Sequence, residues 1–545
     1  MSDTANQTNP AGEPADDLAD RAVYIGQWAA LRPDHPAVVV GDGEIVLTYR
    51  QLDERSNQVA HALRSLGAGA GSSIGYLLDN DEHVLEVWWG GMRSGVHITP
   101  INFHLTAPEV DYIVRDSGVR VLFFSSRLAG VVARALAERP DVALVSVGVT
   151  APDESSASPV PGQLDYETLL AAQPVAPVDP EIAGGVMFYS SGTTGYPKGI
   201  KAALSGGGPD DGTSLMKYCA THYRLRRGAV LLSPGPLYHA APVAWTAAMQ
   251  TVGGTSVIAR RFDAEQTLAM IQNQRVTHLQ LVPTMIKRIL DLPAETLARF
   301  DLSSLEMIWH AAAPCPIPLK QRAIEYFGPI IWEYYSGSEG GGTMISSAEW
   351  LERPGSVGRH WSGGTVRVLD PTTHEELPAG EAGLIYFEPI SVHRFAYHND
   401  QAKTDEAFHN GLFTLGDIGY LDADGYVFLT DRKSNTINSG GVNIYPQEIE
   451  NVLSEHPKVH DVAVFGIPHE EMGEQVIAVI ELTDGVAGSE ALKAEFTEFC
   501  RQSLAGYKVP RRIEFEASLP RDANGKLYKR RLRDPYWVGH ASKVI

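Results

Sequence analysis

The chain has 545 residues, a length that favours more than one domain. Hydrophobic residues make up 44% and charged residues 20%, as in ordinary globular proteins. A membrane-spanning helix needs about eighteen consecutive apolar residues, and no apolar run in the sequence is that long. The net charge of −21 disfavours nonspecific nucleic-acid binding, and three widely spaced cysteines without a secretory signal favour a reducing cytoplasm.

The first half of the chain predicts parallel sheets covered by helices. Residues 1–17 are polar and acidic and contain two prolines and a glycine, which predicts a disordered tail. Beyond this tail, short apolar runs alternate with helical patterns, the order typical of parallel sheets. We expect a helix from about Thr48 to Leu66 and strands at 74–78, 119–124, 257–258 and 277–282.

The pattern changes in the last third of the chain. Short alternating stretches at 365–369 and 383–387 predict a smaller β-rich unit. From about residue 434 onward we expect a compact α+β unit, with a helix near 447–455 and strands at 459–467 and 475–482. The predicted fold class is therefore α/β with a small α+β unit at the C-terminal end.

The most informative segment follows the apolar run at 185–189. It contains Ser190, Ser191, Gly192, Thr193, Thr194, Gly195 and Lys198. Glycines let backbone N–H groups turn toward an anion, and the hydroxyls and the ammonium add further donors. The segment is not a Walker A loop, because Lys198 is followed by Gly199. We interpret it as a polyphosphate-binding loop; the alternative is a polar surface turn between two strands.

Further motifs follow in a fixed order: Tyr238–Ala240, Tyr335–Glu339, Thr414–Asp417, Asp431–Lys433, Ser439–Gly441 with Tyr445 and Pro446, and Asn524–Lys526. Together with the loop at 190–199, they resemble the motifs of the adenylate-forming enzymes, which include acyl-CoA synthetases, aryl-CoA ligases, luciferase and peptide-synthetase adenylation domains. The resemblance implies a large N-terminal domain at 18–433, built of helix-covered parallel sheets and a β-rich subdomain. It also implies a small mobile C-terminal domain at 434–545, with a hinge near Ser434.

The same resemblance implies a reaction and its cofactors. ATP converts a carboxylic acid to an acyl-adenylate with release of pyrophosphate, and the thiol of coenzyme A then takes the acyl group and releases AMP. Glu339 would hold Mg²⁺, Tyr335 would stack on adenine, and Asp417 and Arg432 would bind the ribose. Further nucleotide contacts would come from Ala311, Ala312, Ala313, Ser336 and Ser338. The alternative for Asp417 and Arg432 is a surface ion pair.

Three more roles come from the resemblance. Lys526 would bridge the substrate carboxylate and the α-phosphate, whereas the charge run around it would by itself favour a solvated surface lysine. His239 would lie where the acyl pocket meets the nucleotide, although a lone histidine can also be a satisfied core group. Gly440 and Gly441 would line the channel for the pantetheine arm of coenzyme A.

The substrate is the least determined feature. Gly340, Gly341 and Gly342 follow the metal-binding glutamate, and alanines 240, 241, 244, 247 and 248 follow His239. In the enzymes that the chain resembles, this neighbourhood lines the acyl pocket, so small side chains here imply a roomy apolar pocket for a medium- or long-chain fatty acid or a bulky polycyclic acid such as a steroid or terpenoid. The alternative is that the glycines only permit a backbone turn. Two other functions stay open: an acyl-AMP ligase that loads a carrier protein, and a non-catalytic binding protein on the same scaffold.

Overall fold

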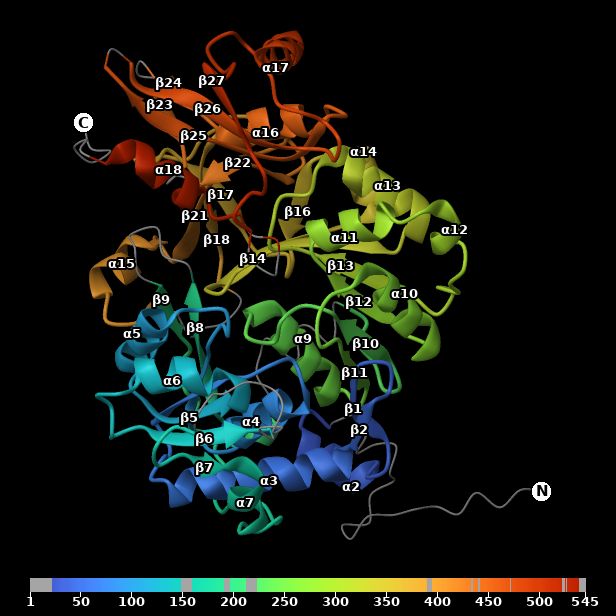
Figure 1. Cartoon of the computed structure of the whole chain (residues 1–545), viewed down its shortest axis with the longest axis vertical. Helices are drawn as coiled ribbons and strands as arrows, with labels where there is room; N and C mark the ends of the chain where they lie inside the picture. The colour runs from blue at the N-terminus through green and yellow to red at the C-terminus, as the bar shows by residue number, and fades with distance from the viewer. Residues whose placement is uncertain are drawn as a thin grey trace. The chain divides into compact units, whose positions relative to one another are not determined.

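The computed structural model describes residues 22–148, 159–190, 197–211, 223–389, 395–432, 435–439, 442–470, 472–521, 525 and 527–538 (Figure 1). The chain divides into two compact units. Unit 1 comprises Met1–Leu281, Leu292–Ile308 and Ser391–Thr404, and unit 2 comprises Val282–Asp291, Trp309–Ile390 and Asp405–Ile545. The predicted domain boundary at 433/434 falls on residues outside the described ranges and stays a prediction.

Unit 1 contains two groups of strands that form mostly parallel ladders. Within its described part, one sheet has the strand order β19-β9-β8-β4-β3-β5-β6-β7, in which only the β8–β9 and β9–β19 pairs are antiparallel. Its strands are β3 (Ser73–Leu77), β4 (His97–Pro100), β5 (Val119–Ser125), β6 (Ala143–Val147), β7 (Leu164–Asp165), β8 (Gly185–Ser190), β9 (Lys198–Lys201) and β19 (Ala396–Tyr397).

The second group of strands in unit 1 runs in the order β12-β10-β11-β1-β2. All pairs in it are parallel except the β1–β2 hairpin. Its strands are β1 (Pro36–Val40), β2 (Ile45–Thr48), β10 (Val230–Ser233), β11 (Thr255–Ile258) and β12 (His278–Leu281). Because the strands of both groups are largely buried, they need helices on their faces, and the predicted parallel sheets are confirmed.

Several helices of unit 1, among them α3, α4 and α10, begin at a residue whose side chain caps the first turn. Thr48 and Gln51 form a capping box at the start of α3, and the predicted helix at about 48–66 is confirmed. The helices are α2 (Ile25–Leu31), α3 (Tyr49–Ser65), α4 (Glu82–Met92), α5 (Ala107–Ser117), α6 (Ala129–Ala135), α7 (Tyr166–Ala171), α9 (Ala240–Thr251), α10 (Ala264–Asn273) and α12 (Ala294–Leu297). Strand β13 (Met307–His310) and helix α15 (Gln401–Glu406) cross the division between the units.

Unit 2 begins with an antiparallel sheet in the order β17-β18-β21-β22-β16-β15-β14, to which β20 adds by pairing with β21. The strands are β14 (Ile331–Gly337), β15 (Gly340–Ser346), β16 (Ser356–His360), β17 (Val366–Leu369), β18 (Gly383–Phe387), β20 (Phe408–His409), β21 (Leu412–Leu421) and β22 (Val427–Arg432). The helices are α11 (Pro283–Leu290), α13 (Ile317–Phe327) and α14 (Ser347–Glu352). The predicted β-rich region after residue 365 is thus part of a longer antiparallel sheet.

The C-terminal part of unit 2 has a sheet and a core of its own. The sheet runs β24-β23-β26-β25, and β27 pairs with β26 in parallel. Its elements are β23 (Ile437–Ser439), β24 (Val442–Ile444), α16 (Pro446–Ser454), β25 (Val459–His469), β26 (Gly473–Leu482), α17 (Glu490–Ser503), β27 (Arg512–Glu516) and α18 (Lys529–Trp537). Ile449, Val464, Ile480 and Phe496 lie in its buried core, which confirms the predicted α+β unit.

The described helices include none that is long and apolar enough to cross a membrane.

Candidate active site

The predicted phosphate loop joins two antiparallel strands of unit 1. Strand β8 ends at Ser190, and β9 begins at Lys198, which is the register partner of Ser190. Residues 191–196, which include five of the predicted phosphate ligands, lie outside the described residues, as does the side chain of Ser190. Lys198 is half-buried at the first position of β9. The expected buried strand leading into the loop is therefore confirmed, whereas the loop's own contacts stay a prediction.

The ends of β8 and β9 that flank this loop are held by helix α5 and by His398, the residue after β19. The Tyr189 hydroxyl donates to Asp116 Oδ2 at 2.7 Å, and the Tyr112 hydroxyl donates to the Pro197 carbonyl at 3.2 Å. The backbone N–H of His398 donates to the Gly199 carbonyl at 2.8 Å. These contacts fix the positions of the two strand ends, which the seven residues 191–197 connect.

His239 stands at the N-cap of α9, in a segment that a buried asparagine holds in place. Asn80 Nδ2 donates to the Gly235 carbonyl at 2.9 Å, and Asn80 Oδ1 accepts from the Leu237 N–H at 2.8 Å. The Tyr76 hydroxyl also donates to the Leu237 carbonyl at 2.7 Å. The position of His239 thus depends on side chains more than 150 residues earlier in the chain, Asn80 among them. Sequence reasoning missed Asn80, because its partners are backbone groups that no local motif marks.

In unit 2, the motif at 335–339 ends strand β14 and forms its turn into β15. Tyr335 and Ser336 are half-buried on β14, Ser338 is exposed in the turn, and Glu339 is half-buried beside it. Glu339 belongs to no group of three metal-binding side chains in the described part of the chain. A single carboxylate of this kind fits Mg²⁺, which takes one or two protein carboxylates and completes its shell with water and substrate phosphates.

Tyr335 on β14 and Asp417 on β21 contact each other in unit 2. The Tyr335 hydroxyl donates a hydrogen bond to Asp417 Oδ2, and the Asp417 side chain is buried. Asp417 on β21 is also the register partner of Arg432 on β22. The structure therefore links three of the predicted nucleotide residues: Tyr335 to Asp417 through their side chains, and Asp417 to Arg432 through strand pairing. The Arg432 side chain lies outside the described residues, so the alternative of an ion pair with Asp417 is not decided.

The glycines at 340–342 permit backbone conformations that other residues rarely adopt, and only part of this segment leaves room for a substrate. All three have positive φ values, +100°, +67° and +132°. A Cβ on Gly341 would clash with the Phe413 ring, and one on Gly342 would clash with the backbone carbonyl of Tyr335. Only Gly340 faces open space. For Gly341 and Gly342 the structure favours the backbone-turn interpretation, because neighbouring atoms already fill the space.

The alanines of α9 divide into two sets. Ala247 and Ala248 are buried in the core, whereas Ala240, Ala241 and Ala244 are half-buried at the start of the helix. These three positions follow helical spacing and share one face. The predicted apolar lining is consequently limited to the first turn and a half of α9, next to His239.

The predicted adenine loop follows β13. Ala311 is buried, Ala313 is half-buried, and Ala312 is exposed with φ +74°. A left-handed backbone is unfavourable for alanine, so the surrounding structure has to hold the loop in this conformation. Cys315 follows in the same loop, and burial together with the Glu333 carboxylate raises the pKa of its thiol. A thiol with a raised pKa is a poor nucleophile, which agrees with a packing role for Cys315.

The remaining predicted residues lie outside the described ranges. Lys526 is one of them, but the preceding residue, Gly525, lies directly against Thr284 at the start of α11. A Cβ at Gly525 would clash with the Thr284 side chain, so this approach requires glycine. Gly440 and Gly441 are also outside the described residues, between β23 and β24.

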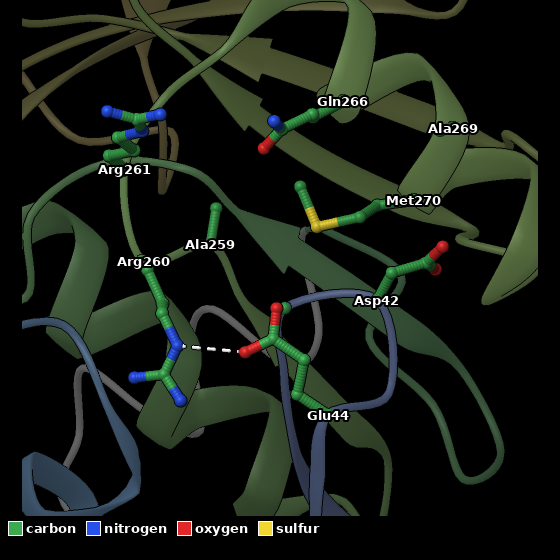
Figure 2. Close-up of a pocket in the computed structure, with 9 residues that line it drawn as sticks. Asp42, Glu44, Ala259, Arg260, Arg261, Gln266, Ala269 and Met270 are labelled. Atoms are coloured by element: carbon green, nitrogen blue, oxygen red, sulfur yellow. Dashed lines mark hydrogen bonds and ion pairs between the residues drawn. The ribbon is translucent and has the colours of Figure 1, made fainter.

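Figure 2 shows a separate cavity of about 490 Å³ in unit 1. It lies beyond the carboxyl ends of the parallel strands β1 and β11, and charged side chains line much of it. Arg260 Nε lies 3.0 Å from Glu44 Oε2 across it. None of the predicted site residues that the structure describes lines this cavity.

Comparison with known families tests the resemblance directly. The model of the AMP-binding enzyme family matches residues 25–394, and that of the AMP-binding enzyme C-terminal domain matches residues 448–526. The chain belongs to the AMP-binding enzyme family. As a member of this family it is an adenylate-forming enzyme of the acid–thiol ligase class. Its mixed α/β fold, with a large N-terminal and a small C-terminal domain, is that of the family's solved structures.

Individual relatives of this AMP-binding enzyme differ in their acceptor. It is 32% identical to the fatty acid–[acyl-carrier-protein] ligase ScoC of Streptomyces coeruleorubidus over 95% of this chain and 96% of the relative. It is 30% identical to the long-chain-fatty-acid–CoA ligase FadD13 of Mycobacterium tuberculosis, over 94% and 97%. Among solved structures, the anthranilate CoA ligase AuaEII in complex with anthranoyl-AMP has a TM-score of 0.80 at 26% identity, over 96% of this chain and 99% of that chain.

Proposed function

We propose that this AMP-binding enzyme is an ATP-dependent acyl-CoA synthetase. It activates a carboxylic acid as an acyl-adenylate with release of pyrophosphate, then transfers the acyl group to coenzyme A with release of AMP. The observation that carries the proposal is the hydrogen-bonded pair of Tyr335 and Asp417, in register with Arg432. An aromatic ring beside a buried carboxylate offers a stacking face for adenine and two acceptors for the ribose hydroxyls.

Cations remove the main electrostatic obstacle to the first half-reaction. A carboxylate has to approach a polyphosphate, and two like charges 4 Å apart cost about 4 kcal/mol at an effective dielectric constant of about 20. Lys198 at the start of β9 and Lys526 of the Asn524–Lys526 motif would supply positive charge to the α-phosphate and the acid. Glu339 would hold Mg²⁺, which when bound neutralises phosphate charge.

The C-terminal part of unit 2 would serve both half-reactions. Lys526 would assist adenylation, whereas Gly440 and Gly441 would admit the pantetheine arm to the adenylate. These residues belong to segments far apart in the sequence of the proposed small domain, so the two steps would require two orientations of that domain. A pivot near Ser434 would absorb the change in backbone angles.

The substrate we propose is an apolar acid, a medium- or long-chain fatty acid in the first place and a bulky polycyclic acid in the second. The half-buried alanine face at the start of α9 supports it, because small apolar side chains leave space beside His239. The names of the relatives ScoC and FadD13 point to fatty acids as well.

Loading of a carrier protein is the second candidate. The likeness to ScoC, named as a fatty acid–[acyl-carrier-protein] ligase, favours it as much as the likeness to FadD13 favours coenzyme A. In both cases the first half-reaction is the same, and only the thiol acceptor differs.

One set of assays tests the proposal. Acid-dependent ATP–pyrophosphate exchange is measured over a panel of fatty, aryl and polycyclic acids, and we expect exchange with the apolar members. The best acid is then offered with coenzyme A or with a phosphopantetheinylated carrier protein. Acyl-CoA as the main product supports the proposal, and product with the carrier protein alone favours the second candidate. Absence of exchange over the whole panel would refute adenylate formation.

A further inference from the structure

A buried ion pair lies directly behind the predicted adenine loop in unit 2. Lys320 on α13 is 1% exposed, and its Nζ lies 2.5 Å from Oε2 of Glu333 on β14. The Lys320 ammonium is 4.9 Å from the centroid of the Trp350 ring. His310, at the end of β13 and fully buried, places its Nε2 3.8 Å from the same Glu333 oxygen. Neither the proposed reaction nor the family motifs described above assign a role to this group.

The ion pair joins the elements that carry the nucleotide residues. The segment 311–316 runs from His310 on β13 to the start of α13. The ion pair ties α13 to β14 and so fixes the C-terminal end of this loop relative to β14. Glu333 and Tyr335 are two residues apart on one strand, so their side chains leave the same face of the sheet. A shift of Lys320 or Glu333 would therefore move the Ala311–Ala313 loop relative to Tyr335.

Stability alone does not account for such a pair. Removing two charges from water is so costly that apolar residues of similar volume are often equally stabilising, or more so. What a buried pair can add is a single arrangement of the elements that it joins. The loop needs such a constraint, because Ala312 has a left-handed backbone, which is unfavourable for alanine.

We propose that Lys320 and Glu333 are positioning residues for the adenine nucleotide, and that their ion pair holds the 311–316 loop and Tyr335 at the spacing that receives the base. The inference rests on the proposed function, because it takes these elements as the nucleotide site. It adds two residues that act through the loop and the strand, without touching the nucleotide.

The test compares variants that alter the pair in two ways. The double variant Lys320→Met with Glu333→Leu removes both charges and leaves no unpaired one. Glu333→Asp keeps the charges but withdraws the carboxylate by one methylene group. The control is the exposed ion pair of the C-terminal part, changed as Lys458→Ala with Glu495→Ala. For each protein, the Kd of ATP and AMP is measured by calorimetry without acid, followed by the KM for the acid and the melting temperature.

We expect the Kd of ATP and AMP to rise by about tenfold or more in both test variants, since small misplacements of binding groups are costly. The KM for the acid should change by less than about twofold, and the control should match the wild type, because neither depends on the spacing of the adenine loop. An unchanged Kd in a folded test variant overturns the inference, and so does an equal loss of affinity for nucleotide and acid. If the double variant does not fold, Glu333→Asp decides the question. A wild-type chain that binds ATP but shows no exchange refutes the proposed function and leaves this test intact.

Discussion

The hydroxyl of Tyr335 donates a hydrogen bond to the carboxylate of Asp417, 82 residues later in the chain. The bond links the end of β14 to the middle of β21 and places one carboxylate oxygen at the tyrosine hydroxyl. Two motifs that are separate in the sequence therefore form one group. If this group binds the nucleoside part of ATP, the tyrosine contributes both its ring and its hydroxyl.

Replacing Tyr335 by phenylalanine separates these two contributions. The ring stays, but the carboxylate of Asp417 loses a donor, and a hydrogen bond to a charged group contributes about 1.5–3 kcal/mol. We expect the KM for ATP to rise by about tenfold or more, with a smaller effect on the KM for the acid. Steady-state kinetics check this against Tyr420→Phe, whose ring stacks on Phe428 on the same sheet. An equal rise in both variants would contradict the role of the hydroxyl.

Lys526 should matter for one half-reaction only. Lys526→Ala is expected to lower acid-dependent ATP–pyrophosphate exchange by about 100-fold or more, the scale for removal of a preorganised charge. Transfer from a supplied acyl-adenylate to coenzyme A should be spared. Arg530→Ala is the matched control, because Arg530 pairs with Asp534 on the exposed helix α18. The assignment fails if both half-reactions fall equally.

Asn80 should contribute to stability and to the placement of His239. Asn80→Ala removes three buried hydrogen bonds, to Gly235, Leu237 and Ala259, each worth about 1 kcal/mol. We expect the free energy of unfolding in urea to fall by about 3 kcal/mol, with a raised KM for the acid in the folded fraction.

Asn273→Ala provides the comparison for this change, because the Asn273 amide donates to Asp42 at an exposed site. It should shift the free energy of unfolding by about 0.5 kcal/mol or less. Similar decreases in the free energy of unfolding in the two variants would contradict a stabilising role for the Asn80 hydrogen bonds.

The glycines after Glu339 should differ in their tolerance of alanine. Gly342→Ala combines a positive φ with a clash against the Tyr335 carbonyl, and we expect a loss of about 3 kcal/mol or more in the free energy of unfolding. Gly340→Ala has the positive φ alone and should lose about 1–2 kcal/mol. Chemical denaturation of both variants measures the difference. The reverse order would restore the view that Gly342 borders an open pocket.

The free energy of unfolding should decrease at acid pH, because His278 is buried in its neutral form. Burial lowers the pKa of His278 to about 4, although Glu306 opposes the shift. In the unfolded chain the pKa is about 6.5, so the unfolded state binds the extra proton first as the pH falls. The free energy of unfolding should drop by about 3 kcal/mol as the pH falls from above 6.5 to below 4 on account of His278, and this histidine adds nothing further once it is protonated in both states.

Urea titrations at a series of pH values check this prediction. In His278→Gln the acid-side slope should be shallower, since the group that takes up the proton on unfolding is missing. The same slope in wild type and variant would show that His278 is not responsible.

Much of the fold could be read from local patterns. The cap and the apolar spacing predict the helix at 49–65, and apolar runs predict the strands at 119–125 and 459–469. These signals depend on neighbours within a few residues, which is why the sequence alone predicts them. The ordered motifs likewise sufficed to identify the family, because each is a short run with a specific chemistry.

Contacts between distant segments were decided only by the tertiary structure. Lys320 stands in the apolar stripe of α13 with Ala323 and Ile324, a signal that sequence reasoning could have used, but its partner Glu333 is set by how the helix packs on β14. The glycines at 341 and 342 looked like open space until Phe413 and the Tyr335 carbonyl were placed beside them. By itself the sequence thus determined the local elements, the order of the motifs and the family. Burial, pairing and free volume depend on residues far apart in the chain, and packing alone brings those together.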